Sequence, residues 1–397
     1  MFSKVLKRYH QDKLVIIDPT FPQKEPFAFR NTEINEYLTR IKNVTAYAMY
    51  PMLPDEHAWF KHGYGMKPEE FVKNINGYKN HYPKLAKKIK HLRPNTKYSF
   101  DLAYSFFLAE TYVLLPFYEK NKIPFVFVLY PGGAFGIDNA KSDRMLRRIF
   151  ESPYFRGVIV TQRITKNYLI RKKLCSRNKI EYIFGGFVQF SEKDILPKVK
   201  YKIDKTTLDI CFVAAKYSNQ GVDKGYDLFV DVAKIIANKT PDVHFHVVGG
   251  FDRNEVDISG LDGRIEFYGY QKPDFLKEFY SKMDILLSPN RPFKLYEGNF
   301  DGFPIGADAS YCGVALFVSD ELNMNEHYKD KNDIVLISLN AKTIADNILY
   351  YYSNTGELYD LASRGQERSR KLFSTKRQIN ARMNFFKQFL SLELSNE

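Results

Sequence analysis

Residues 210–237, ICFVAAKYSNQGVDKGYDLFVDVAKIIA, contain the elements from which the fold can be predicted. The apolar run at 210–214 indicates a buried strand, and residues 226–237 have the apolar spacing of an amphipathic helix. Between them lies a loop with glycine at positions 221 and 225. A strand that leads through a glycine-containing loop into a helix is the repeating unit of a parallel α/β sheet.

The same alternation extends in both directions from this unit. Further strands are predicted at 14–17, 44–50, 125–130, 158–161, 244–248, 265–268, 285–287 and 314–318, and helices at 33–41, 143–150, 273–282, 308–312 and 376–394. A polar, lysine-rich stretch at 191–207 separates two such series. The fold class is therefore α/β, with two doubly wound, Rossmann-like domains at 1–203 and 204–375 and a final helix, 376–397, that returns to the first domain. Ligands of such sheets bind beyond the carboxyl ends of the strands, so the site is expected in a cleft between the domains.

Charge is distributed unequally between the two halves. Residues 1–200 hold 35 Lys or Arg and 18 Asp or Glu, a net charge of +17, which leaves 24 and 28, a net of −4, for residues 201–397. The hydrophobic content of 44% is sufficient for packed cores and excludes a disordered or fibrous chain. The two halves are expected to bind different partners.

Three cysteines, at 175, 211 and 312, are too few and too far apart for a disulfide framework or a zinc site. A reducing, intracellular compartment is expected, and residues 1–13 lack the apolar core of a signal peptide. The most apolar stretch, 99–118, contains Asp101, Glu110 and Pro116, which makes it a poor membrane span. The chain is expected to be cytoplasmic, either soluble or peripheral to a membrane.

Two lysines follow the strand at 210–214. Lys216 comes directly after it, and Lys224 precedes Gly225 at the predicted start of the next helix. Two cations beside a glycine-containing turn and a helix N-terminus are suited to binding a diphosphate, although a solvated loop fits the same residues. Gly249 and Gly250 end the next strand, where glycine allows close approach of a ligand or simply forms a turn.

The segment 288–320 has the highest density of residues suited to a binding site. It contains Asp301-Gly302-Phe303-Pro304-Ile305-Gly306 and then Asp308, before a helix and a strand. Backbone N–H groups of such a loop can bind an anion or sugar hydroxyl groups, and Asp301 can accept hydrogen bonds from hydroxyl groups. Asp308 is either a second such acceptor or an N-cap of the helix.

The order of these segments over residues 208–320 resembles the carboxyl-terminal domain of GT-B-fold glycosyltransferases, most closely the retaining group known as glycosyltransferase family 4. The resemblance implies that Lys216 and Lys224 bind the donor diphosphate. It also implies that Asp301, with Phe303, Pro304, Ile305 and Gly306, meets the donor sugar, and that Asp308 holds the ribose. Departures from the family pattern are aspartate in place of both glutamates, a spacing shorter by one residue, and lysine in place of arginine at 216, which loses a bidentate fork.

A glycine-rich loop follows the strand at 125–130. Where many relatives carry a histidine, this chain has Tyr130, and the loop continues through Gly132, Gly133 and Phe135. These four residues are candidates for a cleft or acceptor site, and a tight turn is the alternative.

A basic segment without acidic residues extends from Pro83 to Phe100. Helical spacing would place Lys84, Lys87, Lys88 and His91 on one face, with Lys90 nearby. Such a face would suit an anionic membrane surface or acceptor, and a solvated helix is the alternative.

Taken with these features, the resemblance implies a retaining hexosyltransferase that moves a hexose from a nucleotide diphosphate sugar to a glycan, glycolipid or glycoprotein in bacterial surface polysaccharide or glycoprotein assembly. The lysines would replace a metal ion, and no cofactor is expected. Two alternatives remain: a non-catalytic GT-B accessory subunit, favoured by the altered Asp301 and Asp308, and a glycosyltransferase acting on nucleic acid, favoured by the basic half.

Overall fold

The computed structural model describes residues 11–24, 29–51, 65–93, 96–300 and 306–391. The chain divides into two compact units: unit 1 comprises Met1–Phe184 and Gln378–Glu397, and unit 2 comprises Gly185–Arg377. The chain leaves unit 1 before the predicted boundary at 203/204. The reason is that the intervening segment packs on unit 2, where Val199 N donates to Ser281 O at 2.9 Å and Lys198 Nζ donates to Tyr280 O at 2.9 Å.

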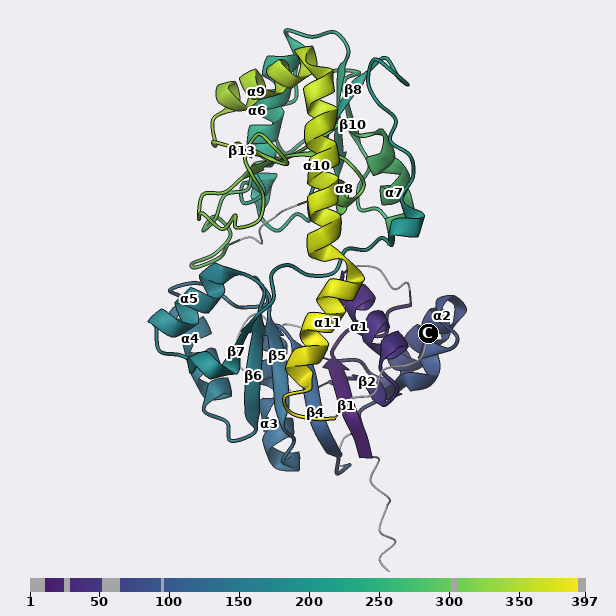
Figure 1. Ribbon diagram of the computed structural model, residues 1–397, viewed down its shortest axis with the longest axis vertical. Helices are drawn as coiled ribbons and strands as arrows, with labels where there is room; N and C mark the ends of the chain where they lie inside the picture. Colours follow the sequence, from purple (N-terminus) through teal and green to yellow (C-terminus); the bar gives the residue numbers. More distant parts are fainter. Residues whose placement is uncertain (1–10, 25–28, 52–64, 94–95, 301–305, 392–397) are drawn as a thin grey trace, which may run out of the picture. The chain divides into compact units, whose positions relative to one another are not determined.

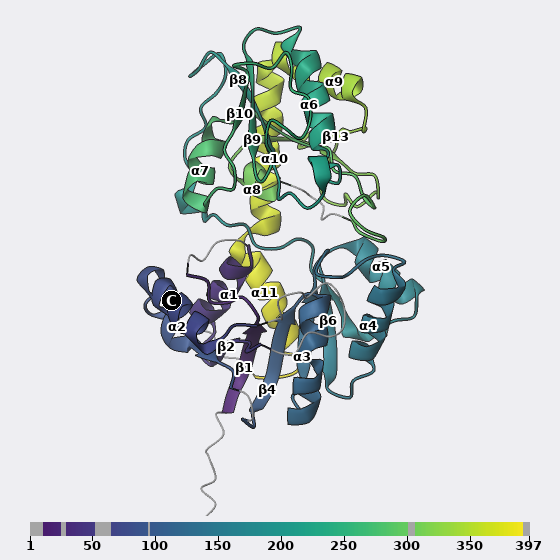
Figure 2. The same cartoon turned by 180° about the vertical axis from the view of Figure 1, so that it is seen from behind.

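Unit 1 contains a sheet of seven parallel strands in the order β3-β2-β1-β4-β5-β6-β7 (Figure 1). The strands are β1 (Gln11–Asp18), β2 (Val44–Ala48), β3 (Ile89–His91), β4 (Ser99–Phe106), β5 (Phe125–Leu129), β6 (Phe155–Val160) and β7 (Ile180–Tyr182). The helices are α1 (Phe29–Arg40), α2 (Pro68–His81), α3 (Leu108–Asn121), α4 (Ala140–Phe150) and α5 (Arg163–Arg171), together with most of α11 (Thr375–Phe386). Figure 1 shows α11 in front of the sheet, and Figure 2 shows α3 on the opposite face.

Helix α11 is held on unit 1 by a fully buried ion pair. Arg382 Nε lies 3.1 Å from Glu33 Oε1, and both side chains are inaccessible to solvent. The Glu33 carboxylate also accepts hydrogen bonds from the hydroxyl groups of Tyr37, Tyr104 and Tyr130, at 2.8, 2.8 and 2.6 Å. Because every charged atom of this pair has partners, burial is tolerated, and the network links α11 to α1 and to the sheet.

Unit 2 contains a sheet of six parallel strands in the order β10-β9-β8-β11-β12-β13. The strands are β8 (Leu208–Val213), β9 (Val243–Val248), β10 (Ile265–Phe267), β11 (Ile285–Ser288), β12 (Ala315–Ser319) and β13 (Val335–Ile337). The helices are α6 (Tyr226–Ala237), α7 (Pro273–Lys282), α8 (Ala307–Tyr311), α9 (Ala341–Ser353) and α10 (Thr355–Phe373). Short 3₁₀ turns also occur at Leu85–Lys88, Arg177–Lys179, Glu192–Asp194 and Asn219–Gly221.

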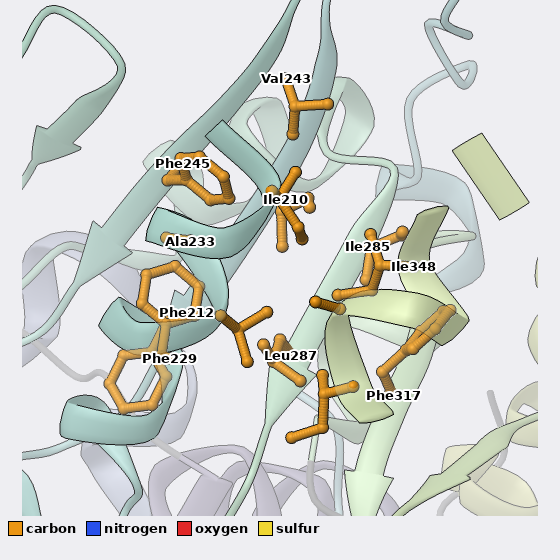
Figure 3. Packing of buried hydrophobic residues seen from close by; sticks show 14 of the residues in the cluster. Ile210, Phe212, Phe229, Ala233, Val243, Phe245, Ile285, Leu287, Phe317 and Ile348 are labelled. Atoms are coloured by element: carbon orange, nitrogen blue, oxygen red, sulfur yellow. The ribbon is translucent and has the colours of Figure 1, made fainter. Parts of the chain in front are cut away.

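The core of unit 2 shows why residues 210–237 predict the fold. Figure 3 shows Phe229 and Ala233 of α6 with Phe212 and Phe245 of the strands on one side of the core, and Ile348 of α9 with Ile285 and Phe317 on the other. These side chains are at most 1% exposed. The apolar face that the helical spacing predicts for α6 therefore packs on the strand that the continuous apolar run predicts for β8.

Both sheets place their first strand in the interior, third from one edge. The chain winds outward from β1 through β2 and β3, then crosses to β4 on the other side, and it does the same from β8 through β9 and β10 to β11. The connections therefore reverse direction between β1 and β4 and between β8 and β11. Open α/β sheets bind ligands at the carboxyl ends of the strands at this switch point.

The prediction of a helix carrying Lys84, Lys87, Lys88 and His91 is wrong. Residues Leu85–Lys88 form one 3₁₀ turn, after which Ile89–His91 continue as β3 and pair in parallel with β2. The apolar residues Ile89 and Leu92 are buried at the edge of the sheet, where pairing with β2 holds the backbone extended and overrides the helical spacing.

The apolar stretch from 99 to 118 consists of two elements. Strand β4 ends at Phe106 and helix α3 begins at Leu108. No helix in the described part of the chain is both long and apolar enough to cross a membrane. The strand–helix reversal occurs at Phe107, whose φ of 54° and ψ of 160° are strained for a bulky residue.

Candidate functional site

The switch point of unit 2 is formed by the loops that follow β8 and β11. Arg291 N donates to Asp223 O at 2.9 Å, so the two loops run side by side. Gly225 adopts a left-handed conformation, with φ of 75°, and a Cβ atom there would lie 2.1 Å from Pro289 O. Glycine is therefore required at 225, as the N-cap of α6.

The two predicted diphosphate ligands both lie on the loop after β8, in different surroundings. Lys224 Nζ lies 5.6 Å from the centre of the Tyr217 ring, which is 64% exposed. Lys216 Nζ forms an ion pair with Glu255 Oε1 at 2.6 Å. One predicted cation is thus neutralised by a carboxylate from the loop after β9, which the sequence analysis did not identify.

Two glycines follow β9, and close packing against the backbone requires glycine at the first of them, Gly249. A Cβ atom at Gly249, where φ is 128°, would lie 1.9 Å from Ala214 O. At Gly250 it would lie 2.9 Å from the Tyr270 ring. Tyr270 is 67% exposed, and Lys216 N donates to its hydroxyl at 3.3 Å. Tyr270 is therefore an exposed aromatic ring next to the predicted diphosphate ligands, which sequence reasoning missed because exposure cannot be read from residue type.

The residues predicted to meet the donor sugar lie partly outside the described residues. Asp301, Phe303, Pro304 and Ile305 fall in the segment 301–305, which is not described. Gly306 is the N-cap of α8 with a φ of 85°, and a Cβ atom there would lie 2.1 Å from Leu286 Cδ2. This glycine fixes the point at which the loop joins the sheet.

Asp308 is not the N-cap of α8, because Gly306 holds that position. Its Oδ1 accepts from Gln189 N at 3.0 Å, and its Oδ2 accepts from Gln189 Nε2 at 2.9 Å. Burial raises the pKa of Asp308, and the bonds from Gln189 oppose this effect. Each carboxylate oxygen retains a second lone pair that can accept from a ligand hydroxyl.

Asn290, the second residue after β11, has an unsatisfied donor. The residue is 5% exposed, and its Nδ2 has no hydrogen-bond partner among the residues that the structure describes. The backbone carbonyl oxygen of Asn290 accepts from Ser319 Oγ at 2.7 Å. A buried amide donor without a partner is energetically unfavourable unless a ligand or water completes it.

The predicted acceptor residues of unit 1 are largely packed inside it. Tyr130 is buried, and its hydroxyl donates to Glu33 and accepts from Arg382 Nη2 at 3.1 Å. Phe135 is fully buried, and its N–H closes a turn by donating to Gly132 O at 3.0 Å. A Cβ atom at Gly133 would collide with Phe107, whereas one at Gly132 would meet nothing within 4 Å. Of this group, only Gly132 borders open space.

The basic segment is also more integrated into the fold than predicted. Lys88 Nζ donates to Leu38 O at 2.6 Å and Ile41 O at 3.0 Å, where it caps the end of α1, and burial lowers its pKa. Lys90 Nζ lies 5.7 Å from the centre of the Tyr47 ring. Lys84 and Lys87 are exposed.

No group of three or more His, Cys, Asp or Glu side chains suited to holding a metal ion occurs in residues 11–24, 29–51, 65–93, 96–300 and 306–391. His246 of β9 is buried and contacts two neighbouring side chains. Its Nε2 lies 2.7 Å from Asp209 Oδ1, and its Nδ1 lies 3.0 Å from the Tyr268 hydroxyl.

Comparison with known proteins places these features in a family context. Residues 208–354 match the family model described as "Glycosyl transferases group 1". This matched segment contains every described residue of the unit 2 switch point named above except Gln189. A search of curated proteins finds no match to the chain.

Solved structures share the fold over nearly the whole chain. Sucrose-phosphate synthase from Thermosynechococcus elongatus has a TM-score of 0.64 and 16% identity, covering 95% of this chain and 99% of that one. Anabaena HepE in complex with UDP has a TM-score of 0.64 and 14% identity, with coverage of 94% and 100%. A glycosyltransferase from Rickettsia africae has a TM-score of 0.61 and 12% identity, with coverage of 96% and 100%. The predicted GT-B fold class and the resemblance to GT-B glycosyltransferases are confirmed, and assignment to family 4 stays a prediction.

Proposed function

We propose that the chain is a glycosyltransferase that takes a hexose from a nucleotide diphosphate sugar bound by unit 2. The observation that carries the proposal is that the family-model match over 208–354 coincides with a switch point bearing Lys216 and Lys224. In support, one structural neighbour, HepE, has been solved in complex with UDP-glucose.

Each residue of the switch point has a proposed role in the reaction. Lys224 and Lys216 neutralise the negative charge that develops on the diphosphate as the glycosidic bond breaks. The buried Nδ2 of Asn290 donates to a phosphate or ribose oxygen, and the Tyr270 ring stacks on the base. Asp301, as a family-based assignment, positions the sugar, and transfer proceeds with retention of configuration.

The lysines are proposed to carry the charge for which other transferases use a divalent ion. Transfer should then proceed in excess EDTA, measured as release of nucleotide diphosphate. A loss of activity that Mg²⁺ or Mn²⁺ restores would contradict this part of the proposal.

A thermal-shift screen tests nucleotide binding directly. UDP, GDP, dTDP, CDP and ADP are each added to the wild-type chain, to Lys224→Ala and to Lys342→Ala, which removes an exposed lysine of α9. A ligand at 100 times its Kd stabilises the folded state by about 2.7 kcal/mol. One base should raise Tm for the wild type and Lys342→Ala but much less for Lys224→Ala. If none of the five nucleotides raises the wild-type Tm, the proposal fails.

The acceptor is proposed to be a glycan, glycolipid or glycoprotein of bacterial surface assembly, reached by peripheral binding to an anionic membrane. The support is the net charge of +17 on residues 1–200 and the exposure of Lys84 and Lys87. Each lysine near an anionic surface contributes about 1 kcal/mol. Replacing Lys84 and Lys87 with Gln should weaken co-sedimentation with phosphatidylglycerol vesicles about tenfold or more, whereas Lys342→Gln should not. Unchanged sedimentation would remove the membrane part of the proposal.

A further inference from the structure

Unit 1 has its own switch point, between β1 and β4, and it holds a buried cluster of charged side chains. Asp18 ends β1, Glu110 lies in the first turn of α3 after β4, and Arg30 lies on α1. Arg30 Nη1 donates to Asp18 Oδ2 at 3.0 Å and to Glu110 Oε1 at 2.9 Å. The guanidinium thus brings both carboxylates to the crevice where the sheet connections reverse.

One carboxylate oxygen in this cluster is unsatisfied. Glu110 is 5% exposed, and its Oε2 has no hydrogen-bond partner among the described residues. Asp18, in contrast, is fully engaged, because its Oδ1 also accepts from Thr20 N and Phe21 N, both at 2.8 Å. A buried carboxylate oxygen without a partner destabilises the fold, which is expected where a ligand supplies the missing donor.

Arg30 has unused hydrogen-bonding capacity beside this oxygen. All of its hydrogen bonds to described residues are made through Nη1, which leaves Nε and Nη2 as available donors. Its guanidinium carbon lies 4.9 Å from the centre of the Phe107 ring. Phe107 and Phe29 are both partly exposed, with ring centres 6.5 Å apart.

These features define the chemistry of the ligand. Asp18 and Glu110 both face the single Arg30 guanidinium, so an anion would meet two acidic side chains, while the guanidinium repels a cation. A hydroxyl group fits both free positions, because it donates to Glu110 Oε2 while accepting from Arg30. Apolar ring faces beside such polar groups suit the C–H face of a sugar.

We propose that Glu110, Arg30 and Phe107 form a sugar-binding site in which Glu110 Oε2 accepts from a hydroxyl group of the sugar. The proposal deepens the proposed function, and on that basis the sugar belongs either to the acceptor or to the hexose of the donor. The strained backbone of Phe107 is consistent with a residue held in place for binding.

Saturation-transfer NMR with defined sugars tests the site. The probes are the methyl α- and β-glycosides of glucose, galactose, mannose, N-acetylglucosamine and rhamnose, each titrated into the full chain. At least one should bind the wild type, and Glu110→Gln should raise its Kd at least tenfold, since a glutamine whose oxygen faces Arg30 places an NH₂ group, which cannot accept, at the position of Oε2. Arg30→Lys, which keeps the charge but loses the fork, should also weaken binding.

The matched control is Glu119→Gln, also on α3. Glu119 pairs with Arg148 at 2.5 Å on the surface of the same unit, so its loss removes a Glu–Arg pair without touching the cluster. Sugar binding by this variant should equal that of the wild type. If Glu110→Gln does not fold, Arg30→Lys gives the same test, and Tm measured for each variant shows which of them are folded.

Two results overturn the proposal: no glycoside binds the wild type, or Glu110→Gln and Arg30→Lys both bind as the wild type does. Excess nucleotide sugar distinguishes the two sources of the ligand. Displacement of the glycoside assigns the site to the donor hexose, and simultaneous binding assigns it to the acceptor. If a nucleotide stabilises the chain but no glycoside binds, this site is refuted and the proposed function stands. If a glycoside binds but no nucleotide stabilises the chain, the proposed function is refuted and this site stands.

Discussion

The two units share one topology but treat charge at their switch points in opposite ways. In unit 1, Asp18 and Glu110 are buried, and both form ion pairs with the half-buried Arg30. In unit 2, Lys224 lies on a loop beside an exposed tyrosine, and glycines line the same edge. This difference shows that the net charge of a half of the sequence does not predict the sign of the charged residues at the switch point of that half. The basic half of the sequence has a carboxylate-rich switch point, and the acidic half has a lysine-bearing one.

The largest effect is expected at the buried ion pair of unit 1. Arg382→Met leaves Glu33 as an uncompensated buried charge, since Arg382 is the basic partner of that carboxylate. The free energy of unfolding of unit 1 should fall by about 3–5 kcal/mol. Urea unfolding followed by circular dichroism measures the loss.

Arg148→Gln is the control for that variant. It breaks the Arg148–Glu119 pair on the surface of the same unit, which should change the stability by less than about 1 kcal/mol. Equal losses for Arg382→Met and Arg148→Gln would mean that buried and exposed charges in unit 1 contribute alike, and the contrast between the two units would lose its basis.

The next effect is on activity rather than stability. Lys224→Ala removes a loop cation that lies over the exposed Tyr217 ring, and an exposed cation–π contact contributes about 0.5–1 kcal/mol, so Tm should stay within about 2 °C of the wild type. Loss of one charge that stabilises the leaving group should lower kcat roughly 100-fold, measured as release of nucleotide diphosphate from the donor. Unchanged turnover, with Lys342→Ala as the control, would contradict the role of Lys224 in binding the diphosphate.

Strands β1, β2, β5, β6 and β8 to β12 and helices α1, α4, α6, α7, α8 and α11 could be predicted from local sequence. Helices α6 and α7 begin and end at the predicted residues, because each has a clear apolar face and a glycine or proline at its start. Strands β3, β4, β7 and β13 and helices α2, α3, α5, α9 and α10 were missed. Strands β3, β7 and β13 are three residues long, and their pairing with a neighbouring strand, rather than any periodicity, makes them strands. Strand β4 lies in the apolar stretch 99–118, which runs without a break in hydrophobicity into α3.

Residues of the candidate site could be recognised in the sequence only where they lie together on a loop that follows a predicted strand. Lys216, Lys224, Gly249 and Gly250 are recognisable because glycine and lysine follow strand ends in the sequence. The ion pair of Arg30 with Glu110 joins residues 80 positions apart, and no local pattern indicates it. Glu255 was missed for the same reason.

A third prediction uses pH to separate a structural from a functional Glu110. Burial raises the pKa of Glu110 from 4.5 to about 8, with Arg30 opposing the shift and Asp18 adding to it. The folded state therefore holds this proton more tightly than the unfolded state does. The resulting stability is fully present below about pH 4.5 and is lost as the pH rises through 8.

Glu110→Gln cannot titrate at this position, so its Tm relative to the wild type should increase with pH. Between pH 5.5 and 7.5 the difference should grow by roughly 5 °C, measured by differential scanning calorimetry. The groups that face Glu110, namely Arg30, Asp18 and Tyr118, are present in both proteins. A difference in Tm that is constant with pH would show that Glu110 is ionised throughout.

The smallest effect concerns Glu255, which forms an ion pair with Lys216 in unit 2. The Nζ to Oε1 distance of 2.6 Å means that a diphosphate must compete with a carboxylate for the same ammonium group. Glu255→Gln keeps the shape of the side chain and removes its charge, so affinity for the nucleotide should rise about fivefold, or about 1 kcal/mol. Isothermal titration with the nucleotide found in the thermal-shift screen measures this gain, which should shrink at high salt.

Asp257→Asn is the matched control, because Asp257 pairs with Lys234 at 2.7 Å only two residues further along the same loop. Its removal should leave nucleotide affinity unchanged. If Glu255→Gln instead weakens binding, the carboxylate orients Lys216 toward the ligand rather than competing with it. Unit 2 would then resemble unit 1, with an acidic side chain holding a cation in place, and the contrast between the two switch points would be reduced to a difference in exposure.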